Sequence, residues 1–295
     1  MALVDPFGRE IKGLRISVTS RCNLRCIYCH NEGEPSSGRE MSKDTIVNVV
    51  LAGSKLGIRR VKFTGGEPLL RSDLEEILSE LEGISDISLT TNGTMLAERA
   101  ASLADSGLTR VNISLDSLDR EIYGQITGGG ERDLERVIDG IEAAFSSGLT
   151  PVKLNMVILK SNQDGVWDMI EFARKKGAIL QLIELLDLKN LGISGDLRGI
   201  ESILEKKSDR IQTRDMHRRR KYFLGSAEVE VVRPIDNSEF CANCTRLRVT
   251  ADGRIKPCLL RNDNLVEMET EDLEEIKRLL KIATGRREPY FVKKA

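Results

Sequence analysis

Apolar and polar residues alternate in two different patterns from the start of the chain to about residue 187. Short apolar runs are typical of buried strands, and longer segments with apolar positions three and four residues apart are typical of amphipathic helices. The predicted strands are residues 14–19, 61–64, 87–90, 111–115, 152–159 and 179–185. The predicted helices are residues 42–56, 72–81, 96–106, 133–145 and 165–175.

The regular order of strand and helix predicts the fold class. About six βα units in series favour an α/β fold with a parallel sheet, and crossovers of one hand curl such a sheet into a partial or full TIM-like (β/α) barrel. Functional groups of these folds gather at the carboxyl ends of the strands. Residues with useful chemistry lie at or near those predicted ends: Cys22, Gly65, Thr91, Ser114, Asn155 and Glu184.

The pattern changes after Asp187, where a connection over residues 190–199 leads to a charged helix. Further strands are expected near residues 222–224, 229–233 and 247–250, with a hairpin turn at Asp252-Gly253 and a last helix near residues 273–282. We therefore expect a barrel core over residues 1–187 and a smaller C-terminal α+β extension over residues 188–295.

The charge balance limits the classes of ligand. The chain has 45 Lys and Arg against 46 Asp and Glu, a net charge of −1, so we expect neither a nucleic-acid partner nor a membrane surface. An anionic ligand must then be held by a local basic site. The beginning of the sequence does not resemble a secretory leader, and we expect a cytoplasmic protein in which thiols stay reduced.

The first cysteine group has the spacing C-x3-C-x2-C, formed by Cys22, Cys26 and Cys29 in the loop after the first predicted strand. Three thiolates on one loop can hold a [4Fe–4S] cluster and leave its fourth iron open for a small molecule. The alternative is a structural zinc site in which the adjacent His30 supplies the fourth ligand.

The second group, Cys241, Cys244 and Cys258, has the spacing C-x2-C-x13-C. A zinc site with four ligands is not obvious, because His217 lies 24 residues before Cys241, and a second [4Fe–4S] cluster with an open iron suits three cysteines better. Arg246 and Arg248 follow at a spacing that places both on one face of a strand, where they can form a fork for phosphate. The alternative is a solvated strand face.

Several motifs together carry a resemblance to a known family. They are Gly-Gly-Glu-Pro at 65–68, Thr-Thr-Asn-Gly at 90–93, VNISLDSLD at 111–119 and CANCTRLR at 241–248, beside the two cysteine groups. With these motifs the sequence resembles the GTP 3′,8-cyclase family of the radical S-adenosylmethionine (SAM) superfamily over about residues 5–260.

The resemblance implies roles for individual residues. The catalytic residues would be Cys22, Cys26, Cys29, Arg246 and Arg248, with both cysteine trios as ligands of two [4Fe–4S] clusters. Residues expected to bind SAM are Tyr28, near the adenine, Gly65, Gly66 and Glu67, near the methionine amino group, Ser114 and Asp116, at the ribose, and Asn155 and Leu186. Residues expected to bind GTP are Arg15, Lys62, Thr90, Lys153, Arg246, Leu247 and Arg248.

The implied reaction converts GTP to (8S)-3′,8-cyclo-7,8-dihydroguanosine 5′-triphosphate, the first step of molybdenum cofactor synthesis. Cyclic pyranopterin monophosphate synthase would receive the product, an unidentified donor would supply electrons, and the protein would be a monomer or homodimer. Another radical SAM enzyme with one auxiliary cluster is the alternative. A non-enzymatic iron–sulfur carrier or zinc-stabilised module is a third hypothesis.

Three features leave open questions. Leu186 stands where the family often has methionine, and leucine conserves the volume but not the sulfur. The segment 291–295 lacks the Gly-Gly tail of many members. The basic run at 217–221 is expected either to be solvated or to line the entrance for the triphosphate.

Overall fold

The computed structural model describes residues 2–33 and 38–292, so residues 293–295 of the tail lie outside the described residues. One sheet of 11 strands has the order β11-β10-β1-β2-β3-β4-β5-β6-β9-β8-β7. The first six strands are β1 (Gly13–Ser17), β2 (Arg60–Thr64), β3 (Asp86–Thr91), β4 (Arg110–Ser114), β5 (Lys153–Ile158) and β6 (Ile179–Glu184). The others are β7 (Arg210–Thr213), β8 (Arg220–Leu224), β9 (Ala227–Val232), β10 (Arg246–Val249) and β11 (Ile255–Lys256).

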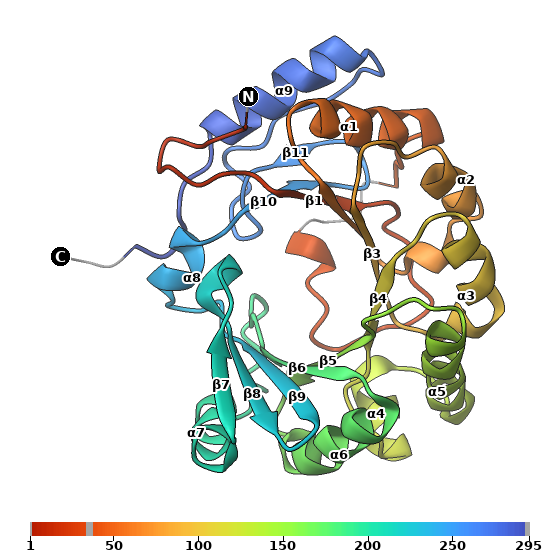
Figure 1. Ribbon diagram of the computed structural model, residues 1–295, viewed down its shortest axis with the longest axis vertical. Helices are drawn as coiled ribbons and strands as arrows, with labels where there is room; N and C mark the ends of the chain where they lie inside the picture. The colour runs from red at the N-terminus through yellow and green to blue at the C-terminus, as the bar shows by residue number, and fades with distance from the viewer. Residues whose placement is uncertain (1, 34–37, 293–295) are drawn as a thin grey trace.

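The α/β fold predicted from the sequence is confirmed. Strands β1 to β6 pair in sequence order and in parallel, and helices lie outside the curved sheet (Figure 1). These helices are α1 (Lys43–Lys55), α2 (Leu74–Ser79), α3 (Leu96–Asp105), α4 (Arg120–Thr127), α5 (Glu131–Ser146) and α6 (Val166–Lys176). The sheet stays open, because β11 and β7 are its two edges, and the fold is a partial barrel.

The C-terminal strands extend both edges of this same sheet. Strand β10 pairs in parallel with β1, and β9 pairs in parallel with β6. The antiparallel pair β10–β11 contains the predicted turn at Asp252-Gly253. The remaining helices are α7 (Leu197–Lys207), α8 (Ser238–Ala242) and α9 (Leu273–Gly285). Sequence reasoning missed α4, α8 and β7, and the division at residue 187 stays a prediction.

Alternation along the strands separates the core from the concave side of the sheet. Ile16 and Phe63 are fully buried in the core, whereas the neighbouring Arg15 and Lys62 line a central cavity. The loop after β1 runs into this concave side, where its orange segment occupies the middle of Figure 1. None of the helices in the described part of the chain is long and apolar enough to cross a membrane.

Candidate active site

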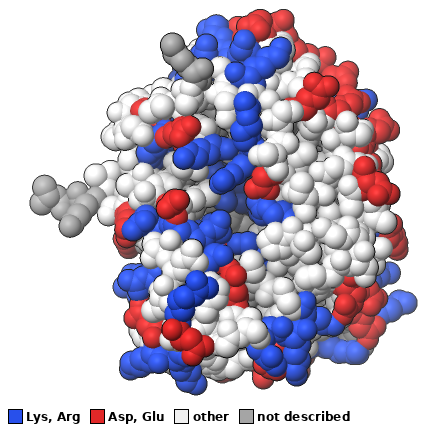
Figure 2. Space-filling view, in the orientation of Figure 1, with Lys and Arg blue, Asp and Glu red and all other residues white. Residues whose placement is uncertain are grey.

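A cavity of about 960 Å³ fills the concave side of the sheet, and all six cysteines line it. Lys and Arg side chains gather around the central hollow in Figure 2. Most residues predicted from the sequence line the cavity as well: Arg15, Tyr28, Lys62, Gly65, Gly66, Thr90, Ser114, Asp116, Lys153, Asn155, Leu186, Arg246 and Arg248. The fold therefore brings the two cysteine groups, which are far apart in sequence, to one chamber.

The first cysteine group lies on the loop after β1. Burial, Asp116 and the neighbouring Cys29 and Cys22 raise the pKa of the Cys26 thiol to about 12. Thiols that raise one another's pKa lie close together, and a metal centre would displace their protons. Within residues 2–33 and 38–292 no group of three or more His, Cys, Asp or Glu side chains could hold a metal ion as it stands.

Glu67 supports this loop from behind the cavity wall. Its buried carboxylate accepts hydrogen bonds from Thr91 Oγ1 at 2.7 Å, from the Asn92 amide at 2.7 Å and from the Leu69 amide at 2.9 Å. The Asn92 side chain in turn donates to Asn23 Oδ1 at 2.8 Å. Glu67 thus connects the predicted Gly-Gly-Glu-Pro and Thr-Thr-Asn-Gly motifs to the cysteine loop. Its direct contact with SAM stays a prediction.

Gly65 and Gly66 explain why two glycines follow β2. A Cβ atom at Gly65 would lie 2.3 Å from the Thr19 carbonyl oxygen, and one at Gly66 would lie 2.2 Å from that of Arg21. The Gly66 amide donates to the Thr19 carbonyl at 2.9 Å. Larger residues would push away the backbone that leads into Cys22, so both glycines hold the cysteine loop against β2.

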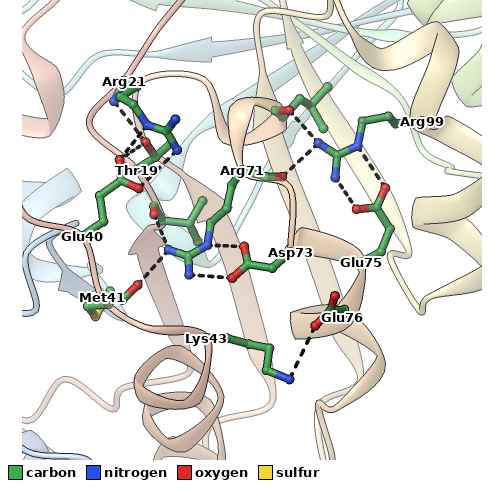
Figure 3. Close-up of polar contacts among 12 residues, drawn as sticks. Thr19, Arg21, Glu40, Met41, Lys43, Arg71, Asp73, Glu75, Glu76 and Arg99 are labelled. Atoms are coloured by element: carbon green, nitrogen blue, oxygen red, sulfur yellow. Dashed lines mark hydrogen bonds and ion pairs between the residues drawn. The ribbon is translucent and has the colours of Figure 1, made fainter.

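Arg71 fixes the start of the same loop (Figure 3). Its Nη1 atom donates to the carbonyl oxygens of Val18 and Met41, both at 2.9 Å, while its Nε and Nη2 atoms bind the carboxylate of Asp73. Arg99 binds the carbonyl oxygens of Leu69 and Arg71 in a similar way. Buried guanidinium groups therefore satisfy the backbone carbonyls of these irregular segments.

The residues expected around the SAM adenosyl group form one cluster. Tyr28 donates to Asp116 Oδ2 at 2.6 Å, and the Val157 amide donates to Asp116 Oδ1 at 2.8 Å. Burial raises the pKa of Asp116 to about 6. The Oδ1 atom of Asn155 is buried and has no hydrogen-bond partner among the described residues. An acceptor without a partner beside a cavity suits a ligand hydroxyl group.

A basic row crosses three neighbouring strands. Strand register places Arg248 beside Arg15 and Arg15 beside Lys62, so the three side chains project from the same face. Glu32, on the loop after the first cysteines, joins two of them: Arg15 Nη2 lies 2.5 Å from its Oε1 atom and Arg248 Nη1 lies 2.9 Å from its Oε2 atom. These two cations lower the pKa of Glu32 to about 2. Sequence reasoning missed Glu32.

Lys62 and Arg246 stand apart from this pairing. Among the described residues neither makes a hydrogen bond or an ion pair through its side chain, although both line the cavity. Burial and the charges of Arg246, Arg15, Arg110 and Lys153 hold the pKa of Lys62 well below its usual range. Cations that crowd together without counterions create a strongly positive field, which suits a polyanion.

Glu230 on β9 organises a second basic group. Its fully buried carboxylate accepts from Lys153 Nζ at 2.7 Å and from Gln181 Nε2 at 2.7 Å, and it lies 3.1 Å from both Arg214 Nη1 and Arg219 Nη1. Sequence reasoning predicted Lys153 but missed the other partners. The segment 227–232 alternates between polar and apolar residues. Such alternation fits polar side chains that face the inside of a barrel as well as polar side chains that face the solvent, so it could have suggested an inward-facing Glu230.

Residues of the basic run at 217–221 lie in two environments, the cavity wall and the protein surface. His217 is buried and stacks on Phe240 with ring centroids 3.7 Å apart, and His217, Arg219 and Lys221 line the cavity. The more exposed Arg218 and Arg220 pair with Glu239 and Glu205 at the surface. His217 and Arg218 lie in a turn with positive φ angles of 62° and 51°, and Arg219, Arg220 and Lys221 then alternate between the cavity and the solvent as the chain enters β8.

Two predicted residues do not reach the cavity. Leu247 is fully buried in the hydrophobic core, on the opposite face of β10 from Arg246 and Arg248, and the Glu67 carboxylate lies behind the wall. A side-chain contact between Leu247 and a ligand is not supported by this placement. Its contact with GTP stays a prediction.

Comparisons with known families agree with this geometry. The Radical SAM superfamily model matches residues 16–173, and the Molybdenum Cofactor Synthesis C model matches residues 178–292. A protein of Methanosarcina acetivorans named "Probable GTP 3′,8-cyclase" is 52% identical over 98% of this chain and 90% of its own length. A protein of the same name from Methanocella arvoryzae is 51% identical over 98% of this chain and 94% of its own length.

Solved structures support the fold. The chain is similar to Streptococcus suis SuiB bound to S-adenosylmethionine, with a TM-score of 0.66 and 18% identity over 92% of this chain. It spans 65% of the SuiB chain. A second similar structure is native anSMEcpe with bound AdoMet, with a TM-score of 0.54 and 18% identity over 84% of this chain and 74% of that chain. At such low identity the likeness shows the fold alone.

Proposed function

Because this chain belongs to the radical SAM superfamily, and within it to the family of GTP 3′,8-cyclases, we propose that its cavity binds SAM at one end and GTP at the other. The protein is a GTP 3′,8-cyclase of molybdenum cofactor synthesis, and it uses SAM and an iron–sulfur cluster. The finer assignments below are our proposals.

Cys22, Cys26 and Cys29 would hold a [4Fe–4S] cluster at the SAM end. When bound, this cluster would supply the electron for the reductive cleavage of SAM, and the cavity wall would hold C3′ of GTP within reach of the adenosyl group. Gly65 and Gly66 fix the loop, while Tyr28, Asp116 and the unpartnered Asn155 Oδ1 would orient the adenosyl group. Ser114, Thr90 and Leu186 line the same cavity.

The GTP end would be formed by the basic groups of β1, β2, β5 and β10. Lys62 and Arg246 have no counterion in the described part of the chain, and Arg15, Arg248 and Lys153 line the same wall. A triphosphate neutralises such a group of cations, and arginine binds phosphate through two parallel hydrogen bonds. This uncompensated positive charge in the cavity that both cysteine trios line is the observation that carries the assignment of GTP.

The second trio would hold another [4Fe–4S] cluster. Cys241, Cys244 and Cys258 line the cavity beside Arg246 and Arg248, and Cys258 and Cys244 help to raise the pKa of Cys241. Because only three thiols are available, a cluster held by them would keep one iron without a protein ligand, and the guanine base would bind there. We further propose that the product passes to cyclic pyranopterin monophosphate synthase and that an external donor supplies the electrons.

An anaerobic product assay tests the assignment. The reconstituted protein is incubated with reductant, SAM and GTP, and the products are separated by chromatography and identified by mass spectrometry. We expect 5′-deoxyadenosine together with an isomer of GTP. If 5′-deoxyadenosine forms while GTP stays intact, the enzyme class holds but the substrate is wrong, which would favour another radical SAM enzyme with one auxiliary cluster.

A further inference from the structure

A buried carboxylate near the start of the chain connects its two ends. The Asp5 side chain is fully enclosed and accepts from Arg9 Nε and Arg287 Nη1, both at 2.7 Å, through Oδ2. Its Oδ1 atom accepts from the backbone amides of Phe7 at 3.0 Å and Arg9 at 2.9 Å. Gly8, with a φ of +75°, permits the tight turn between Asp5 and Arg9. These four donors therefore fix the orientation of the Asp5 side chain, which in turn holds two guanidinium groups in place.

Both guanidinium groups then bind the second cysteine loop. Arg9 Nη1 donates to the Cys241 carbonyl oxygen and Arg287 Nη2 donates to the Cys244 carbonyl oxygen, each at 2.9 Å. The N-terminal segment and the segment after α9 both pass beside α8, which contains Cys241 (Figure 1). Arg9 and Arg287 also line the cavity and are 8% and 1% exposed.

The segment after Arg287 continues along the same wall, where Glu288 and Tyr290 line the cavity together with the second cysteine group. Segments from both ends of the chain thus meet at one pair of cysteines.

We propose that Asp5, Arg9 and Arg287 form a clamp that positions the Cys241–Cys244 loop to receive the second cluster. These are positioning residues, which act through the loop backbone. The inference rests on the proposed second cluster.

The test uses the full-length protein after anaerobic reconstitution. Iron and sulfide are measured, and the reduced protein is examined by electron paramagnetic resonance. With two four-iron clusters the unchanged protein should contain about eight iron atoms per chain. Arg287→Ala should retain about four, lose the signal of the second cluster and still form 5′-deoxyadenosine from SAM. Asp5→Asn, which keeps the side-chain shape, should lose the second cluster in part.

Two further variants calibrate the result. Cys258→Ala gives the signal of a protein without the second cluster. Arg174→Ala removes an arginine that pairs with Glu171 on the surface of α6 and does not line the cavity, and it should keep both clusters. Full iron content and an unchanged spectrum in both Arg287→Ala and Asp5→Asn would overturn the clamp alone. About four iron atoms in the unchanged protein would overturn the second cluster itself, and the clamp with it.

Discussion

The Nζ atom of Lys153 lies 2.7 Å from the Oε2 atom of Glu230, inside the cavity wall. Lys153 is predicted to bind GTP, and Glu230 joins it to Arg214, Arg219 and Gln181. A carboxylate in an anion site reduces the positive charge there, yet it also aligns three cations that would otherwise repel each other. The negative charge of Glu230 should weaken GTP binding, whereas its alignment of the three cations should strengthen it.

Glu230→Gln separates these effects. We expect GTP affinity to fall about tenfold although the site becomes more positive, because the buried cations lose their common acceptor and move apart. Isothermal titration of the reconstituted protein with GTP measures the change. Glu205→Gln, which removes the exposed partner of Arg220 outside the cavity, is the control and should bind normally. Tighter binding by Glu230→Gln would show that charge dominates.

Lys62→Met should improve stability while it weakens binding. The ammonium group lies among other cations without a counterion in the described residues, so its removal relieves repulsion in the ligand-free protein. We expect the midpoint of thermal unfolding to rise by about 2 °C, or about 1 kcal/mol, and GTP affinity to fall about tenfold. The exposed Lys55→Met is the control for both measurements. A lower midpoint in Lys62→Met would contradict the repulsion argument.

GTP binding should weaken as the pH rises through about 8. Burial lowers the pKa of Lys153 from 10.5 to about 8, so above that pH the neutral amine no longer attracts phosphate. In the unfolded chain the lysine keeps its proton up to a pH of about 10.5. The ligand-free fold should therefore become more stable as the pH rises from about 8 to about 10.5, because the unfolded state binds the additional proton in this range. Other charged groups that face Lys153 are Glu230, Arg214, Arg219 and Lys62. The pKa of Lys62 is lowered as well, so loss of its proton also contributes to the pH dependence. Lys153→Arg should therefore flatten the affinity profile in part. An unchanged profile would exclude Lys153 as its source.

Glu67→Gln should impair the first cluster site without touching the cavity. An amide cannot accept all three hydrogen bonds from Thr91, Asn92 and Leu69, so the support of the cysteine loop is lost. We expect SAM cleavage without GTP to fall about tenfold or more, with less iron in the first site. The exposed Glu76→Gln is the control. Normal cleavage and iron content in Glu67→Gln would refute the support role.

Apolar runs and cysteine spacing are local signals, and they predicted the strands and the two cysteine groups. Arg15, Lys62 and Arg248 were implied by the resemblance to the family, and the strand register places them in adjacent positions. Glu230 was missed because an inward-facing acidic residue looks like an exposed one. Asp5 and Arg287 were missed because their contact joins residues 282 positions apart. Long-range polar contacts of this kind leave no periodic pattern.

The central claim is that this cavity brings the adenosyl group of SAM to C3′ of GTP. The most direct measurement uses GTP with deuterium at C3′. Mass spectrometry then determines the deuterium content of the 5′-deoxyadenosine formed by the reduced, reconstituted enzyme. We expect one deuterium in 5′-deoxyadenosine and none at C3′ of the cyclised product. If 5′-deoxyadenosine forms without deuterium while the labelled GTP remains intact, GTP is not the hydrogen donor and the assignment of this cavity is wrong.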